Sequence, residues 1–310
     1  MSSGLFSGGA RVVLGRLPPA PLRVALDIGG STIKGLRSDG AVFRASTDEI
    51  ERVVDALRGE RVDAVTGGGA LRYGALLAHF AGAETVDEME AAVAGVQALR
   101  AEGLLVDAKG RPVAEEATAG HPIVVCSIGS GTSVLVVSAD GAHRRVTGTC
   151  FGAGTFAGLG FALTGERDAG ALAGLASKVS SAVDLTVGDI YGAEASAKLG
   201  LPPDILAASF AKAPRLDAVE PADAASSLAV LTGWTIGQLA TWVAKAEAAR
   251  HVVFVGGVDG CLRDRLDFPV GFESQGAIAS LFPETEASPF VGAFGALVVA
   301  QRRSAEGVPL

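Results

Sequence analysis

Residues 24–34 read VALDIGGSTIK, a short apolar run that ends in the carboxylate of Asp27 and then turns through two glycines. Gly29 and Gly30 lack a Cβ, so the backbone can reverse there and approach a ligand closely. Successive N–H groups in such a turn bind anions, and Asp27 beside them offers an oxygen to a metal–phosphate complex. The stretch therefore predicts a phosphate-binding β-hairpin, with Val42 and Phe43 beginning its second strand. It matches neither G-x-x-x-x-G-K-[ST] nor G-x-G-x-x-G.

The composition is that of an α/β protein with many tight turns. Of the 310 residues 49% are hydrophobic and only 5% aromatic, and 42 are glycine, which suffices for a large core divided into two lobes. The net charge of −8 is spread along the chain, so we expect no nucleic-acid partner. The cysteines, Cys126, Cys150 and Cys261, are far apart and odd in number. This pattern indicates reduced thiols rather than disulfides or a metal site.

The chain shows neither a membrane-spanning nor a secretory pattern. No run approaches the roughly 18 uninterrupted apolar residues of a membrane helix, so residues 224–246 are interpreted as a buried helix. Residues 1–20 lack the apolar core of a signal peptide and suggest a flexible arm. We expect a cytoplasmic protein that makes no contact with membranes.

Glycine turns follow predicted strands at four places, after Ile28, Val65, Ile128 and Val255. The order strand, glycine turn, strand occurs twice, at 24–43 and 123–138, which is a weak internal repeat. Ligands of α/β sheets bind at such strand ends, often between lobes. A mixed stretch at 101–121 suggests a lobe boundary, giving an N-terminal lobe of 1–118 and a C-terminal lobe of 119–310. The hydrophobic spacing predicts helices at 50–57, 86–99, after 152–156, 224–246 and 290–297.

The chain resembles the type II (eukaryotic-like) pantothenate kinases of the acetate and sugar kinase/Hsp70/actin superfamily, because ten motifs follow one another in the order typical of that family. They are DIGGSTIK (27–34), VTGGGA (65–70), VDEMEAAVAGV (86–96), SIGSGTS (127–133), RVTGTCFGAGTFAGL (145–159), LTG (163–165), DIYG (189–192), ASF (208–210), VVFVGG (252–257) and VGAFGAL (291–297). The resemblance implies a two-lobed, duplicated ribonuclease-H-like (actin-like ATPase) fold with ATP and Mg²⁺ in the cleft. It also implies phosphoryl transfer from ATP to the primary hydroxyl of pantothenate, the first step toward coenzyme A. Homodimers and inhibition by CoA or acyl-CoA are expected on the same ground.

The resemblance assigns roles on the acceptor side. Glu88 matches the catalytic glutamate, which would accept the hydroxyl proton. Acidic first turns of helices are common, and Asp87 and Glu90 are interpreted as no more than that. Ser130 and Ser133, with Arg145 twelve residues after the second serine, match the residues that bind pantothenate. An arginine and two hydroxyls suit a ligand with one carboxylate and one amide.

The resemblance also assigns the nucleotide side. The first phosphate region, 27–34, matches at Asp27, Gly29, Gly30, Ser31 and Lys34, with Asp27 binding Mg²⁺ directly or through water and Lys34 lying near the phosphates. The second lobe contributes substrate-binding residues from 127–145 and glycine loops at 152–158 and 256–257 that line the ATP site, namely Gly129, Gly131, Gly152, Gly154 and Gly256.

Two departures from the family pattern fall on this nucleotide side. Ala153 replaces the middle residue of a triple glycine, and 256–260 reads GGVDG instead of G-N-F-L-R. An alanine held at positive φ would cost about 1 kcal/mol or bend the loop. We therefore expect the departures to affect the binding of ATP more than the binding of the acceptor.

Other functions remain open on the sequence. A superfamily kinase could act on a sugar or on another hydroxy-acid, although Arg145 favours an acidic acceptor. A non-catalytic regulator that binds nucleotide or CoA is compatible with the altered loops, while Glu88, Asp27 and Arg145 argue against it. An iron–sulfur ATPase activator of the same fold is disfavoured, because three scattered cysteines offer no cluster site.

Overall fold

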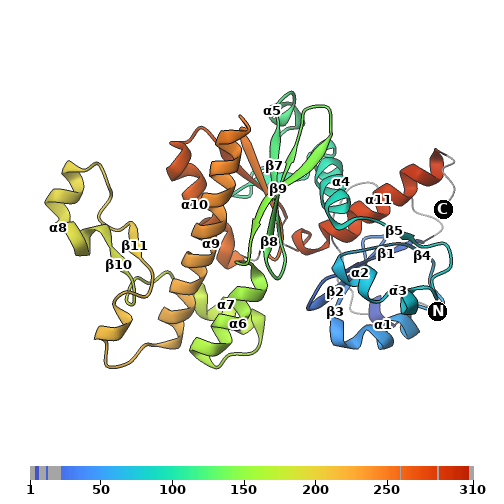
Figure 1. Ribbon diagram of the computed structural model, residues 1–310, viewed down its shortest axis with the longest axis horizontal. Helices are drawn as coiled ribbons and strands as arrows, with labels where there is room; N and C mark the ends of the chain where they lie inside the picture. Colours follow the sequence, from blue (N-terminus) through green and yellow to red (C-terminus); the bar gives the residue numbers. More distant parts are fainter. Residues whose placement is uncertain (1–3, 7–11, 13–21, 259, 285, 307–310) are drawn as a thin grey trace.

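The computed structural model describes residues 4–6, 12, 22–258, 260–284 and 286–306. Two mixed sheets organise the chain (Figure 1). The first has the order β3-β2-β1-β4-β5 and the second β6-β13-β12-β7-β8-β9. The strands of the first are β1 (Val24–Ile28), β2 (Thr32–Arg37), β3 (Val42–Ser46), β4 (Val62–Thr66) and β5 (Glu84–Thr85). Those of the second are β6 (Leu105–Asp107), β7 (Ile123–Ile128), β8 (Thr132–Val137), β9 (His143–Thr149), β12 (His251–Gly256) and β13 (Ala279–Pro283).

The two sheets repeat one arrangement. In each, three consecutive strands pair antiparallel, β1-β2-β3 in the first and β7-β8-β9 in the second. The first strand of each set also pairs in parallel with a later strand, β4 or β12. This confirms the internal repeat, because its shared unit is a strand, a glycine turn and a return strand. The return strand of the first hairpin begins at Thr32, however, and not at Val42.

Two helices lie between the sheets, α4 (Glu88–Ala101) and α11 (Val291–Ala305). Their buried side chains share one core with Ala25 and Leu36 of the first sheet and with Val125 and Leu135 of the second. Glycine lets the helices approach closely, since a Cβ on Gly295 would lie only 1.8 Å from the carbonyl oxygen of Ala91. The last helix of the chain therefore packs onto the first sheet, while β6 joins the second.

The remaining helices cover the outer faces of the sheets. The first sheet carries α1 (Ile50–Ala56), α2 (Gly68–Arg72) and α3 (Gly74–Leu77), and the second carries α6 (Ala153–Thr164), α7 (Ala169–Ala176), α9 (Pro221–Ala246) and α10 (Gly260–Ser274). A short helix, α5 (Glu115–Thr118), precedes β7. None of the described helices combines the length and hydropathy needed to cross a bilayer.

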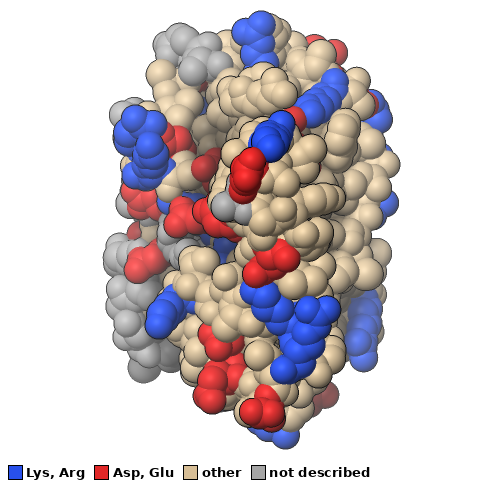
Figure 2. Space-filling view, turned by 90° about the vertical axis from the view of Figure 1, so that its left-hand side faces the viewer, with Lys and Arg blue, Asp and Glu red and all other residues tan. Residues whose placement is uncertain are grey.

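An arm projects beyond α9 and holds α8 (Val187–Lys198) and the two-stranded sheet of β10 (Leu185–Thr186) and β11 (Leu206–Ala208) (Figure 1). The buried carboxylate of Asp184 ties this arm to α9, because it accepts a hydrogen bond from the hydroxyl of Ser227 and another, of 2.8 Å, from the backbone N–H of Phe210. Seen from this end, basic and acidic side chains are interspersed over the surface (Figure 2).

Within the segment expected to be a flexible arm, 1–20, only residues 4–6 and 12 are described. Phe6 differs from that expectation, because it is buried and packs edge-on against Phe43 at 5.1 Å between ring centroids. Elsewhere the buried helix interpreted at 224–246 is confirmed as α9, and Cys126 on β7 is fully buried.

Candidate functional site

The predicted phosphate hairpin joins β1 to β2 through Gly29, Gly30 and Ser31. Asp27 and Lys34 are directly opposed on these strands, and the Lys34 ammonium lies 3.1 Å from the Asp27 carboxylate. Thr47, which follows β3, donates a hydrogen bond of 2.9 Å from its hydroxyl to the carbonyl oxygen of Gly29. Its backbone N–H donates to the carbonyl oxygen of Ser31. Thr47 thus fixes the turn, a role that no motif of the sequence indicates.

Glu88 is the first residue of α4 and faces this hairpin. The backbone N–H of Gly68 donates a hydrogen bond to its carboxylate, and Asp27 and Lys34 act on it electrostatically. Loss of hydration raises the pKa of Glu88, and the negative charge of Asp27 raises it further, while Lys34 opposes both. A raised pKa suits a carboxylate that has to accept a proton.

The loop after β4 brings these groups together. Gly67 has a φ of 86°, a conformation that favours glycine. A Cβ at Gly67 would also lie 2.7 Å from the Asp27 carboxylate, so only glycine fits there. Thr66 is buried and donates a hydrogen bond of 2.8 Å to the carbonyl oxygen of Val86, which fixes the approach to α4. The motif at 65–70 therefore shapes the surroundings of Asp27 and Glu88.

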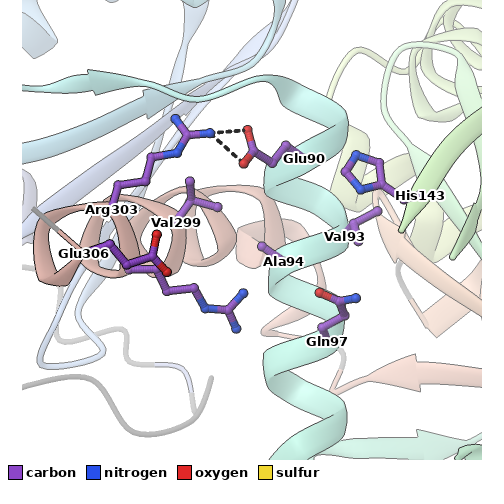
Figure 3. Close-up of a pocket in the computed structure, with 9 residues that line it drawn as sticks. Glu90, Val93, Ala94, Gln97, His143, Val299, Arg303 and Glu306 are labelled. Atoms are coloured by element: carbon purple, nitrogen blue, oxygen red, sulfur yellow. Dashed lines mark hydrogen bonds and ion pairs between the residues drawn. The ribbon is translucent and has the colours of Figure 1, made fainter. Parts of the chain in front are cut away.

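The two neighbouring carboxylates have structural roles. Asp87 caps α4, accepting hydrogen bonds from the backbone N–H groups of Met89 and Glu90. Glu90 accepts two hydrogen bonds from Arg303 of α11, at 2.7 and 2.8 Å (Figure 3). Arg303 also pairs with Glu84. Beside this cluster lies a pocket of about 270 Å³ between α4, α11 and the start of β9.

The acceptor-side residues come from the second sheet. Ser133 lies on β8 and Arg145 on β9, and the Arg145 Nε donates to the Ser133 hydroxyl at 3.4 Å. Ser130 lies in the turn between β7 and β8. A Cβ added to Gly30 would lie 3.5 Å from its hydroxyl oxygen. The glycine turns of the two lobes therefore face each other, with Ser130 opposite the phosphate hairpin.

The nucleotide-side glycines meet around the turn after β7. The N–H of Ala153 donates to the carbonyl oxygen of Gly129 at 2.8 Å, and that of Gly257 to Ile128 at 2.6 Å. Gly256 has a φ of 93° and would clash with Ile128 if it carried a Cβ. The structure thus brings together the five glycines predicted on this side, Gly129, Gly131, Gly152, Gly154 and Gly256.

Ala153 begins α6 and is not among the described residues with positive φ. The conformational cost considered for it therefore does not arise. Its methyl group instead faces Gly257, where an added Cβ would lie at 2.6 Å from that of Ala153. The two departures from the family pattern thus touch each other.

The site offers a divalent cation the carboxylate of Asp27. The described residues contain no group of three or more His, Cys, Asp or Glu side chains that could hold a metal. Asp27 is a single carboxylate beside the phosphate hairpin. This matches Mg²⁺, which keeps several waters and binds through one or two carboxylates and substrate phosphates.

Similar folds define the class of the protein. The activator of 2-hydroxyisocaproyl-CoA dehydratase from Clostridium difficile with bound ADPNP superposes with a TM-score of 0.55, at 16% identity, over 94% of this chain and 99% of its own. A ROK family glucokinase from Streptomyces griseus, in complex with glucose and AMPPNP, gives 0.50 at 14% identity, over 91% of this chain and 100% of its own. The chain thus has the two-lobed fold of the actin-like ATPases and sugar kinases.

Residues 41–299 match the Fumble family, and the chain belongs to it. Pantothenate kinase 2 of Arabidopsis thaliana is 33% identical over 255 residues, which are 77% of this chain and 28% of that protein. Pantothenate kinase 1 of the same plant is 33% identical over 247 residues, 74% of this chain and 64% of that protein. The 4'-phosphopantetheine phosphatase of Mus musculus is 35% identical over 183 residues, 57% of this chain and 22% of that protein. The chain spans less than two thirds of the length of these relatives.

Proposed function

We propose that the protein transfers the γ-phosphoryl group of ATP to the primary hydroxyl of pantothenate. The observation that carries the proposal is the surroundings of Glu88, whose carboxylate faces Asp27 and Lys34 of the phosphate hairpin and has a raised pKa. Two relatives that cover three quarters of the chain are named pantothenate kinases, which supports the acceptor. A base beside a phosphate hairpin is what transfer to an alcohol requires.

Glu88 accepts the proton of the attacking hydroxyl as the new O–P bond forms and the bond to ADP breaks. The hydrogen bond from Gly68 orients the carboxylate, and its raised pKa makes it a stronger base than an ordinary glutamate. Lys34 stabilises negative charge on the transferred group. Ser130 and Ser133 donate hydrogen bonds to the acceptor, and the guanidinium of Arg145 pairs with its carboxylate. The exposed side chain of Arg145, bonded only weakly to Ser133, is available for this pairing.

On the donor side the glycines of both lobes contact ATP through their backbone: Gly29, Gly30 and, on the facing side, Gly129, Gly131, Gly152, Gly154 and Gly256. The Ser31 hydroxyl adds a donor to the phosphates. Mg²⁺ bound by Asp27, directly or through water, would neutralise phosphate charge and orient the γ-phosphoryl group.

The compartment, the oligomeric state and the regulation of the protein are proposed from the family resemblance. We take the protein to be a cytoplasmic homodimer that CoA or acyl-CoA inhibits. Two stacked aromatic side chains of α10 support a dimer interface there, Phe268 at 49% and Phe272 at 37% of their full exposure. Contiguous apolar groups left at a surface are typical of protein–protein contacts.

A non-catalytic regulator that binds nucleotide or CoA is the second candidate. The altered loops at Ala153 and Gly257 favour it. Release of ADP from Mg-ATP separates the candidates when pantothenate, pantothenol and glucose are offered as acceptors in parallel. We expect turnover with pantothenate, whereas turnover with none of the three would support the regulator. Turnover with glucose alone would identify a sugar kinase and refute the proposal.

A further inference from the structure

Three side chains form a row across the first sheet. Asp27 of β1 is directly opposite Lys34 of β2, which is directly opposite Arg44 of β3. Residues directly opposed on adjacent strands project from the same face of a sheet. Arg44 thus stands next to the two charged residues of the phosphate hairpin, although the sequence separates it from Asp27 by a turn and a whole strand.

Arg44 makes no ion pair with any described residue. Its guanidinium lies over the ring of Phe290, 5.3 Å from the centroid, and this is the interaction that the structure gives it. Lys34, by contrast, is paired with Asp27. The protein around the Arg44 guanidinium removes part of its hydration, which lowers its pKa from the usual value. Arginine nevertheless stays charged at neutral pH, so the row carries one uncompensated positive charge.

The surroundings hold this charge at the edge of the cleft. Phe290 is buried just before α11, and Ser288, two residues before it, donates a hydrogen bond to the carbonyl oxygen of Gly256, on the nucleotide side of the second lobe. On the strand of Arg44 itself, Thr47 follows three residues later and bonds to Gly29 of the phosphate hairpin. Arg44 therefore lies on a strand that is bonded to the phosphate hairpin, against a ring whose neighbouring residue Ser288 is bonded to a nucleotide-side glycine.

We propose that Arg44 binds phosphate oxygens of the nucleotide, beside Lys34. The inference rests on the proposed function, because it takes the cleft to hold ATP. A guanidinium offers two parallel N–H donors to a pair of phosphate oxygens, a geometry that an ammonium group cannot provide. Lys34, already paired with Asp27, supplies only part of the positive charge that a polyphosphate requires.

The test measures binding of ATP and of adenosine to the full chain by calorimetry. We expect Arg44→Gln to weaken ATP binding about tenfold, the effect of losing one charge-assisted pair at a partly exposed site, and to leave adenosine binding unchanged. Arg44→Lys should recover part of the loss. Arg167→Gln is the matched control, because Arg167 also lies over a phenylalanine ring, that of Phe161. The Arg167→Gln protein should bind ATP and adenosine as the wild type does.

The other possible results refute either the role proposed for Arg44 or nucleotide binding itself. Equal loss of ATP and adenosine binding in Arg44→Gln would make Arg44 a structural partner of Phe290 and overturn the inference. Unchanged ATP binding would overturn it as well. A wild-type protein that binds neither ligand would refute the nucleotide-binding function itself. Because binding is measured without acceptor, a wrong acceptor leaves this test intact.

Discussion

The contact between Ala153 and Gly257 predicts that a single methyl group will force two nucleotide-side loops apart. A Cβ at position 257 would lie 2.6 Å from that of Ala153, whereas carbon atoms pack best at about 3.5–4.0 Å. Neither atom belongs to a flexible side chain, so the loops themselves have to separate by about 1 Å. Overpacking of this kind typically costs about 1–3 kcal/mol. We therefore expect Gly257→Ala to lower the free energy of unfolding by that amount and to raise the KM for ATP.

The second variant, Ala153→Gly, removes the opposing methyl group. Alone it should cost no more than about 0.5–1 kcal/mol, the penalty for glycine in a helix interior, because Ala153 is the first residue of α6. In this background Gly257→Ala should be nearly silent, so a double-mutant cycle measured by chemical denaturation should give a coupling energy of about 1–3 kcal/mol. Gly158→Ala is the control, because it lies in the same helix with open space around it. Additive costs of the two substitutions would refute the contact between these two departures from the family pattern.

Two further predictions concern the charged groups of the site. Arg145→Ala should raise the KM for pantothenate by at least tenfold, the scale of a lost charge-assisted pair, and leave the KM for ATP unchanged. The preference for pantothenate over pantothenol should narrow in parallel, and equal weakening of both acceptors would show that Arg145 is structural. The raised pKa of Glu88 means that its charged form is disfavoured in the folded state, so its contribution to stability is greatest at low pH and is lost as pH rises through the folded pKa. Glu88→Gln should therefore raise the Tm at pH 7 relative to the wild type, with the difference shrinking toward pH 4, and a lower Tm at pH 7 would contradict the assigned cause of the shift.

The sequence predicted the parts of the fold that depend on local pattern. Strands that end in glycine turns, and the helix around Val93, follow from hydrophobic runs and spacing within one element. The return strand at 32–37 was missed, because glycine, lysine and arginine interrupt its apolar residues. The start of the predicted helix at 50–57 is preceded by a short 3-10 turn, which Ser46 caps by accepting a hydrogen bond from the N–H of Asp48.

The candidate site was predictable only where a motif carries it. Asp27, Glu88 and Arg145 lie in motifs whose residue types suggest chemistry. Arg44 and Thr47 lie in none, and their places depend on strand register and on the close approach of β3 to the hairpin. The ion pair of Glu90 with Arg303 joins residues 213 positions apart. Such contacts arise from tertiary packing, which a local pattern does not encode.

The central claim is that Glu88 takes the proton from pantothenate during phosphoryl transfer. The most direct measurement is formation of phosphopantothenate from Mg-ATP and pantothenate, followed by mass spectrometry, for the wild type and Glu88→Gln. Asp87→Asn is the matched control, because asparagine caps a helix as well as aspartate does. We predict product from the wild type and the control, and a kcat lower by about 10²–10⁴-fold for Glu88→Gln with ATP still bound. A near-normal kcat for Glu88→Gln would contradict the account.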